Sequence, residues 1–152
     1  MNDTGIIARK SAAWDEAITF YEEATKQYKS INDERGMAQT YNNLGSVYAR
    51  KGEWDRAIAM YEQSLETMER VGDIHGMAQT YGNLGNFHQA QGDSERAAWY
   101  MARAYVIFAQ LGAAPGAQQA GRLLIDILGS EEAAEAYLAQ FVQEDDHGYD
   151  NE

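Results

Sequence analysis

The composition of this chain excludes several classes of protein. Its 152 residues include no cysteine and carry 24 acidic against 12 basic side chains, for a formal net charge of −12. Without cysteine there is no disulfide framework and no thiolate metal site, and the cell interior is the default compartment. A chain this negative repels phosphate backbones and anionic lipid, so we expect a cytoplasmic protein that binds neither nucleic acid nor a membrane.

An internal repeat organises the chain. Residues 37–40, Met-Ala-Gln-Thr, return unchanged at 77–80, and Tyr-x-Asn-Leu-Gly follows both copies. A fixed period of about 40 residues is typical of stacked pairs of helices. Only one proline is present, which suits long uninterrupted helices.

Apolar residues recur at helical spacing twice in each repeat, which predicts a hairpin of two helices, A and B. In the second repeat helix A covers 37–50 and helix B covers 53–71, with Gly52 suited to the left-handed turn between them. In chain order we expect one solenoid over 1–143, made of a first repeat (1–36) with a truncated first helix, a second (37–76), a third (77–114) and a diverged capping hairpin (115–143), and then an acidic disordered tail over 144–152.

The first repeat raises a separate question. Its helix B, residues 14–31, has only a stub of helix A, residues 2–10, to cover its apolar face. Three interpretations stay open: the stub suffices, the chain is part of a longer array, or a second copy packs there and forms a homodimer.

Glycines inside helix A indicate close packing between the helices of a hairpin. Gly45 and Gly85 share one register, and a glycine in mid-helix costs about 1 kcal/mol relative to alanine. Together with the small residues Ala57 and Ala97 on helix B, they predict that the two backbones approach closely. A bulky side chain at Gly45 is therefore expected to overpack the contact.

The spacing of these residues resembles a known family. Residues 41–48 read Tyr-x2-Leu-Gly-x2-Tyr and residues 57–61 read Ala-x3-Tyr, which is similar to the tetratricopeptide repeat signature. The longer period and the missing closing proline resemble the repeats of kinesin light chains and spindle-orientation adaptors. The resemblance implies an all-α, right-handed α-solenoid of about 3.5 repeats, whose concave face is lined by helix A and binds extended peptides.

The face of helix A opposite its packing side carries the candidate binding residues. Amides suit an extended peptide because each offers a donor and an acceptor, and the resemblance places Asn43 and Asn83 where family members hold the ligand backbone. The candidates are Gln39, Asn42, Asn43, Ser46, Arg50, Gln79, Asn83, Asn86, Gln89 and Arg122. Ala90 stands where the second repeat has Arg50, so a carboxylate clamp is incomplete and we expect a neutral or basic protein segment as the partner.

The tryptophans are expected to differ in their exposure. Trp14 and Trp54 share one register at the start of helix B, next to the preceding turn, which predicts packing between repeats. Trp99 does not share this register, and both exposure to a partner and burial stay open for it.

No catalytic, cofactor or metal site is expected. The three histidines are scattered, with His88 at a packing position, and no phosphate-binding loop or nucleophile motif occurs. The acidic tail lacks the ligand spacing of a calcium loop. We therefore expect a non-catalytic protein-interaction scaffold. The alternative is a structural module that assembles with its own copies through exposed repeat edges and has no peptide ligand.

Overall fold

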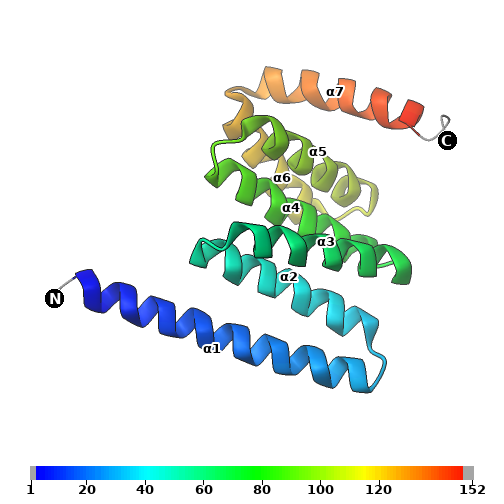
Figure 1. The fold of residues 1–152 in the computed structure, drawn as a ribbon. Helices are drawn as coiled ribbons and strands as arrows, with labels where there is room; N and C mark the ends of the chain where they lie inside the picture. The colour runs from blue at the N-terminus through cyan, green and yellow to red at the C-terminus, as the bar shows by residue number, and fades with distance from the viewer. Residues whose placement is uncertain (1–2, 149–152) are drawn as a thin grey trace. The chain divides into compact units, whose positions relative to one another are not determined.

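The computed structural model describes residues 3–148 of the chain, with side chains from Arg9 to Glu144. All seven elements of this described part are α-helices, which confirms the predicted all-α solenoid class (Figure 1). They are α1 (Asp3–Ser30), α2 (Glu34–Lys51), α3 (Trp54–Val71), α4 (Ile74–Ala90), α5 (Ser94–Gln110), α6 (Ala114–Leu128) and α7 (Glu131–Gly148).

Left-handed residues mark the turns at a regular spacing. Asn32, Gly52, Gly72, Gly92 and Gly112 all have a positive φ, between 55° and 83°. The interval between successive members of this series is constant and is half of the sequence period, so each half-period holds one helix and one turn. Glycine adopts this conformation without steric cost and asparagine tolerates it best among the other residues, which explains why these two residue types end the helices.

Acidic residues directly after three of these turns fix the helix starts. Asp33, Asp73 and Asp93 each accept a hydrogen bond, at 2.9 to 3.1 Å, from the backbone N–H three residues further on. Such a bond satisfies an N–H that the first helical turn leaves without a partner. The start of helix A in the second repeat therefore lies at Glu34, three residues earlier than the sequence predicts.

The first repeat differs from its prediction. The sequence predicts a stub over 2–10 and a separate helix from residue 14, but α1 is one continuous helix of 28 residues. The interval between the turns, counted back from Asn32, leads to Ala12, and Ala13 follows where the next turns have an acid. Alanine is the strongest helix former and offers neither a left-handed turn nor a cap, so the helix runs on without a break.

The chain divides into two compact units, one up to Thr80 and one from Tyr81. In the first unit, α2 lies between α1 and α3 (Figure 1). A Cβ atom on Gly36 would lie 2.5 Å from the ring of Tyr28 in α1, and one on Gly45 would lie 2.8 Å from the ring of Tyr61 in α3. Gly45 thus lies in a tight contact as predicted, but its neighbour is the ring of Tyr61 rather than Ala57 or the backbone of α3.

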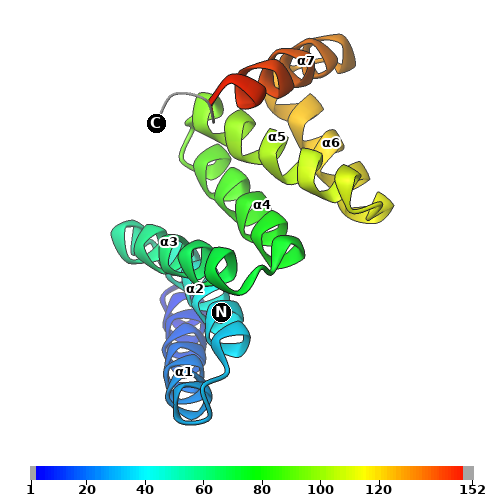
Figure 2. The ribbon, with the colours of Figure 1, turned by 90° about the vertical axis from the view of Figure 1, so that its right-hand side faces the viewer.

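The second unit packs in the same way. A Cβ atom on Gly116 of α6 would lie 2.7 Å from the Phe108 ring of α5, and one on Gly85 of α4 would lie 2.8 Å from the Cε atom of Met101. On its other side α6 contacts α7 (Figure 2), and Leu124 of α6 is fully buried. Each of these glycine contacts places an A-type helix against a large side chain of a B-type helix.

The C-terminal hairpin extends further than predicted. α6 and α7 correspond to the capping hairpin expected over 115–143, but α7 continues to Gly148. Residues 144–148 are therefore helical where the sequence predicts a disordered tail. Residues 149–152 lie outside the described part of the chain.

Candidate functional site

α2 packs against α1 and α3. Its contacts with α1 and α3 bury Gly36, Ala38, Leu44, Gly45 and Tyr48. At about 100° per residue, six polar residues of α2 fall on one strip of the helix, apart from Glu34 and Lys51, which form ion pairs with Arg70 and Asp15. We call this strip the α2 stripe; it consists of Arg35, Gln39, Asn42, Asn43, Ser46 and Arg50.

Three of the predicted residues of the α2 stripe are exposed, namely Gln39, Asn43 and Arg50. Two others are half-buried and have partners within the chain. The Ser46 hydroxyl lies 3.0 Å from the Tyr61 hydroxyl and 3.3 Å from the backbone oxygen of Asn42, and Asn42 has a further interaction within the chain. Ser46 therefore joins α2 to α3, and the open part of the stripe is formed by the exposed residues.

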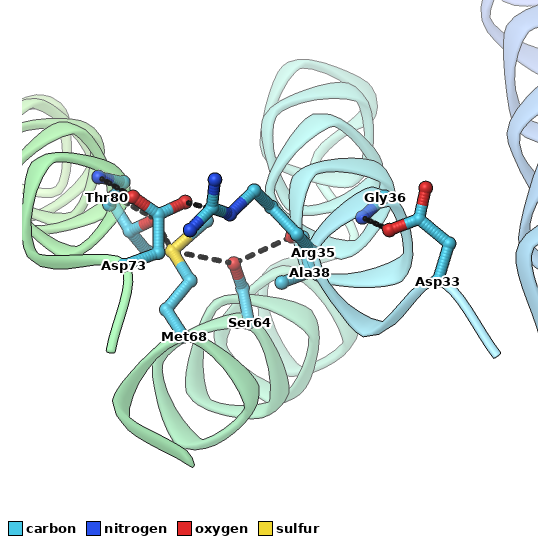
Figure 3. A network of polar contacts seen from close by, with 9 residues as sticks. Asp33, Arg35, Gly36, Ala38, Ser64, Met68, Asp73 and Thr80 are labelled. Carbon is cyan, nitrogen blue, oxygen red and sulfur yellow. Dashed lines mark hydrogen bonds and ion pairs between the residues drawn. The ribbon is translucent and has the colours of Figure 1, made fainter. Parts of the chain in front are cut away.

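Arg35 belongs to the α2 stripe although the sequence did not indicate it. It lies one helical turn before Gln39, its side chain is 63% exposed, and its Nε atom is 3.8 Å from Oδ2 of Asp73 (Figure 3). The other oxygen of Asp73 accepts the N–H of Gly76. The sequence signal that could have identified Arg35 is the helix cap at Asp33, because a helix that begins at residue 34 includes Arg35 on the same face as Gln39.

A buried polar network behind the stripe holds α2 in place. The Ser64 hydroxyl of α3 donates to the backbone oxygen of Ala38 at 2.7 Å and approaches Met68 Sδ at 3.7 Å (Figure 3). The Thr80 hydroxyl of α4 reaches the same sulfur at 3.6 Å. Ser64 and Thr80 are fully buried; the Ser64 hydroxyl holds the backbone of α2, and the Thr80 hydroxyl joins α4 to α3.

The candidate residues of α4 and α6 are mostly placed on open surface. Gln79 is exposed in the part of α4 that belongs to the first unit, and Asn86 and Gln89 are exposed in the second unit. Asn83 is half-buried and has an interaction within the chain. Arg122 is exposed on α6.

An aromatic cluster in the second unit accounts for His88. Its ring is buried and lies parallel to the Tyr100 ring, with 5.3 Å between the ring centres. Burial lowers the pKa of His88 below its ordinary value, with a smaller opposing effect from the carboxylate of Asp93. A stacked neutral imidazole is a packing residue, as the sequence predicted.

The same cluster contains a cation that the sequence did not indicate. The guanidinium of Arg103 lies 5.4 Å from the ring centre of Tyr81 and 5.3 Å from that of Trp99, distances suited to a cation–π interaction. Trp99 also meets Phe141 of α7 edge to face, and is 41% exposed. Trp54 is also exposed, at 53%, so the prediction that it packs between repeats is wrong, whereas Trp14 in the same register is half-buried.

The described residues offer no metal site and no membrane span. No group of three or more His, Asp or Glu side chains in this part of the chain is arranged to hold a metal ion. None of the helices between residues 3 and 148 has the length and apolar character to cross a bilayer. The tail segment considered for calcium lies outside the described side chains.

These features define a class of protein: an α-helical repeat protein built from a regular series of paired helices. Residues 36–110 match the sequence-family model of the tetratricopeptide repeat. Tetratricopeptide repeats therefore cover residues 36–110 of the chain, as the resemblance of residues 41–61 implied.

The comparison with solved structures agrees. The crystal structure of BtubC (BKLC) from P. vanneervenii is similar with a TM-score of 0.69 and 25% sequence identity, over 93% of this chain and 61% of that chain. The chain thus spans about three fifths of the length of BtubC. No curated protein matches the chain.

The matched family has a general role. Tetratricopeptide repeats mediate protein–protein interaction and the family is typically non-catalytic. Proteins built from stacked repeats offer extended surfaces for binding, and the exposed strip of each A-type helix is the polar surface that the packing leaves open.

Proposed function

We propose that the chain is a non-catalytic scaffold that binds an extended segment of a partner protein along the α2 stripe. The exposed amides of the second unit, Asn86 and Gln89, offer a surface of the same kind. The observation that carries the proposal is the pair Gln39 and Asn43, whose amides are exposed on a helix that packs against α1 and α3.

Exposed amides on a fixed helix suit the backbone of an extended peptide. Each amide offers both a donor and an acceptor, which matches the alternating N–H and C=O groups of a peptide without requiring particular side chains. The bonds of Ser64 to Ala38 and of Ser46 to Tyr61 hold the helix before any ligand arrives. A surface ordered in advance loses less conformational entropy on binding.

The charge distribution favours a neutral or basic segment. The net charge of the chain is −12, and a field of this sign attracts cations and repels acidic chains. Arg35, at one end of the α2 stripe, faces the carboxylate of Asp73. Its charge is thereby offset, which leaves Arg50 as the main local cation.

A peptide array probed with the parent protein and with the Gln39→Ala/Asn43→Ala variant tests the proposal. We expect the parent to bind a subset of neutral or basic peptides, and the variant to bind them roughly tenfold more weakly, which corresponds to about 1.4 kcal/mol for two hydrogen-bonding groups. Gln63→Ala is the matched control, because Gln63 is an exposed amide on α3, away from the stripe.

The outcomes distinguish the proposed peptide site from the rival function. Equal binding by the parent and the Gln39→Ala/Asn43→Ala variant would reject the α2 stripe as the peptide site. If the parent bound no peptide but formed stable oligomers, the rival function, a self-assembling structural module without a peptide ligand, would be favoured. Circular dichroism of both variants checks that the helices are retained.

A further inference from the structure

The series of left-handed turn residues is interrupted at one position. From Asn32 to Gly112 residues with positive φ follow one another at a constant interval, and the same interval would place another at position 12. Ala12 stands there, and α1 passes through it as a helix. The segment before Ala12 therefore does not fold back on the segment after it, as α2 folds back on α3.

One face of α1 is open as a consequence. In α3, Tyr61 is 2% exposed and Ser64 is 0% exposed, because α2 covers them. The residues one repeat period earlier, Tyr21 and Ala24, are only half-buried. Phe20, next to Tyr21 in the sequence, is 68% exposed. Within the described part of the chain, α1 thus lacks a helix like the one that covers the same face of α3.

The open residues form an apolar stripe with the spacing of a two-helix seam. Ala13, Ala17, Phe20, Ala24 and Ile31 follow one another at steps of four, three, four and seven, which is the a/d pattern of a coiled coil. Ile31 is 69% exposed. Alanine at three of these positions leaves room for another helix to approach, and an exposed apolar strip, here interrupted by Gln27 between Ala24 and Ile31, marks an interaction surface.

α1 also continues past the helix that it packs against. The side chain of Lys51, the last residue of α2, donates to Oδ1 of Asp15 at 2.7 Å. The part of α1 before Asp15 therefore runs beyond the end of α2 (Figure 1). By register this projecting segment is a helix-A sequence, because Gly5 stands one repeat period before Gly45.

We propose that two copies of this chain pair through α1 in antiparallel orientation, so that residues 3–12 of each copy take the place of the missing helix A on the other. In the second repeat Gly45 packs on Tyr61, and the same register on α1 sets Gly5 against Tyr21 of the second copy. The two-fold axis then falls at Ala13, midway between them. The arrangement is a domain swap, which replacement of a turn by helix formers favours.

One pair of charges on α1 agrees with this antiparallel register. Lys10 and Glu16 lie at equal distances on either side of Ala13, so Lys10 of one copy faces Glu16 of the other, with Arg9 beside it. All three side chains are exposed. Such pairs contribute little to affinity but select the orientation, because a parallel pair would set Glu16 beside Glu16. The proposal does not depend on peptide binding.

The chain contains no cysteine, so single introduced cysteines can report the geometry. We expect Ala13→Cys to be joined across the two copies by a short bis-maleimide linker. Gln27→Cys is the matched control, because Gln27 lies on the same stripe and is exposed but stands two heptads along the helix from the axis. An antiparallel pair would separate the two copies of this position by about 40 Å, at roughly 1.5 Å per residue along each helix.

The outcomes distinguish the other arrangements. Linkage at both positions would show a parallel pair and overturn the antiparallel register. Linkage at neither, in a chain that is a dimer by sedimentation, would show that the copies meet elsewhere. A mass of 17.0 kDa at all accessible concentrations would overturn the dimer itself, and with it the second copy as the occupant of the stripe.

Two further variants, with one control, test the cause of the pairing. Phe20→Glu should raise the dimer Kd by roughly tenfold or more, because a central apolar contact is lost, whereas Ile74→Glu, at an exposed apolar residue of α4, should leave it unchanged. Ala12→Gly/Ala13→Asp restores the turn sequence found at Gly92 and Asp93 and should convert the dimer to a monomer with the same helix content. A turn-restored variant that dimerised as well as the parent would overturn the swap.

Discussion

Replacing Gly45 by alanine should destabilise the first unit, although alanine is the better helix former. The substitution gains about 1 kcal/mol in helix propensity. Its Cβ atom, however, would lie 2.8 Å from Cδ1 and Cε1 of Tyr61 and 3.0 Å from Cγ. That ring is 2% exposed and its hydroxyl is held by Ser46, so it has no room to retreat.

The net change in stability is the difference between the cost of overpacking Tyr61 and the gain in helix propensity. Overpacking a well-filled contact costs about 1–3 kcal/mol, against the gain of about 1 kcal/mol in propensity. Gly45→Ala is therefore expected to be destabilising by up to about 2 kcal/mol, and Gly45→Leu by more. In a domain of this size, about 1 kcal/mol shifts Tm by about 2–4 °C.

Two other glycines inside α4 serve as matched controls. Nothing lies within 4 Å of a Cβ atom on Gly82, so Gly82→Ala should stabilise the chain by about 0.4–1 kcal/mol. At Gly85 the nearest atom is Met101 Cε, at 2.8 Å. This is the mobile end of a flexible side chain, and Gly85→Ala should fall between the other two.

Thermal and urea unfolding can be monitored by circular dichroism. We expect the unfolding midpoint of Gly82→Ala to lie above that of the parent, that of Gly85→Ala near it and that of Gly45→Ala below it. Hydrogen exchange in α2 and α4 assigns each shift to the helix that carries the change. If Gly45→Ala raised the midpoint as much as Gly82→Ala, the contact with Tyr61 would not be the reason for glycine at this position.

Burial lowers the pKa of His88, so below about pH 6.5 the unfolded chain takes up a proton that the folded chain does not. The free energy of unfolding should therefore fall as the pH decreases from about 6.5 to the lowered pKa. His88→Tyr, which places the residue found at Tyr48 in the same register, should remove this part of the pH dependence of Tm. Ser64→Ala removes the 2.7 Å bond to the backbone of the second repeat and should cost about 1 kcal/mol in urea unfolding, with unchanged helix content. Asp73→Ala removes both a helix cap and the partner of Arg35 and should cost about 1 kcal/mol; an unchanged urea midpoint would show that neither contact contributes.

The sequence was sufficient for the class, the repeat and the pairing of helices after residue 37. The apolar spacing and the position of Gly52 set these features locally, and tertiary packing follows the same register. The neighbour of Gly45 was not predictable in the same way. Both Ala57 and Tyr61 lie on the packing side of α3, and only the relative position of the two helices decides that the ring covers the glycine.

The candidate site was predicted only in part. Gln39 and Asn43 are exposed as expected, because a buried face fixes the opposite one. Ser46 was predicted to be open to a ligand, but its hydroxyl lies 3.0 Å from the Tyr61 hydroxyl of α3. A helical wheel of α2 alone does not show how far the side chains of α3 reach. Arg35 was missed because the repeat boundary was set by sequence identity at Met37, whereas the helix starts at its cap.

The two candidate surfaces in the first unit follow from how many neighbours each helix has. α2 contacts α1 on one side and α3 on the other, so its apolar residues pack against these helices and its exposed residues are polar. Within the described residues, α1 has α2 on one side and no helix A on the other, so positions that α3 buries are left more open. Ala12 in place of a turn glycine is therefore a single change with two effects: it lengthens α1, and it uncovers an apolar face with the spacing to bind a helix.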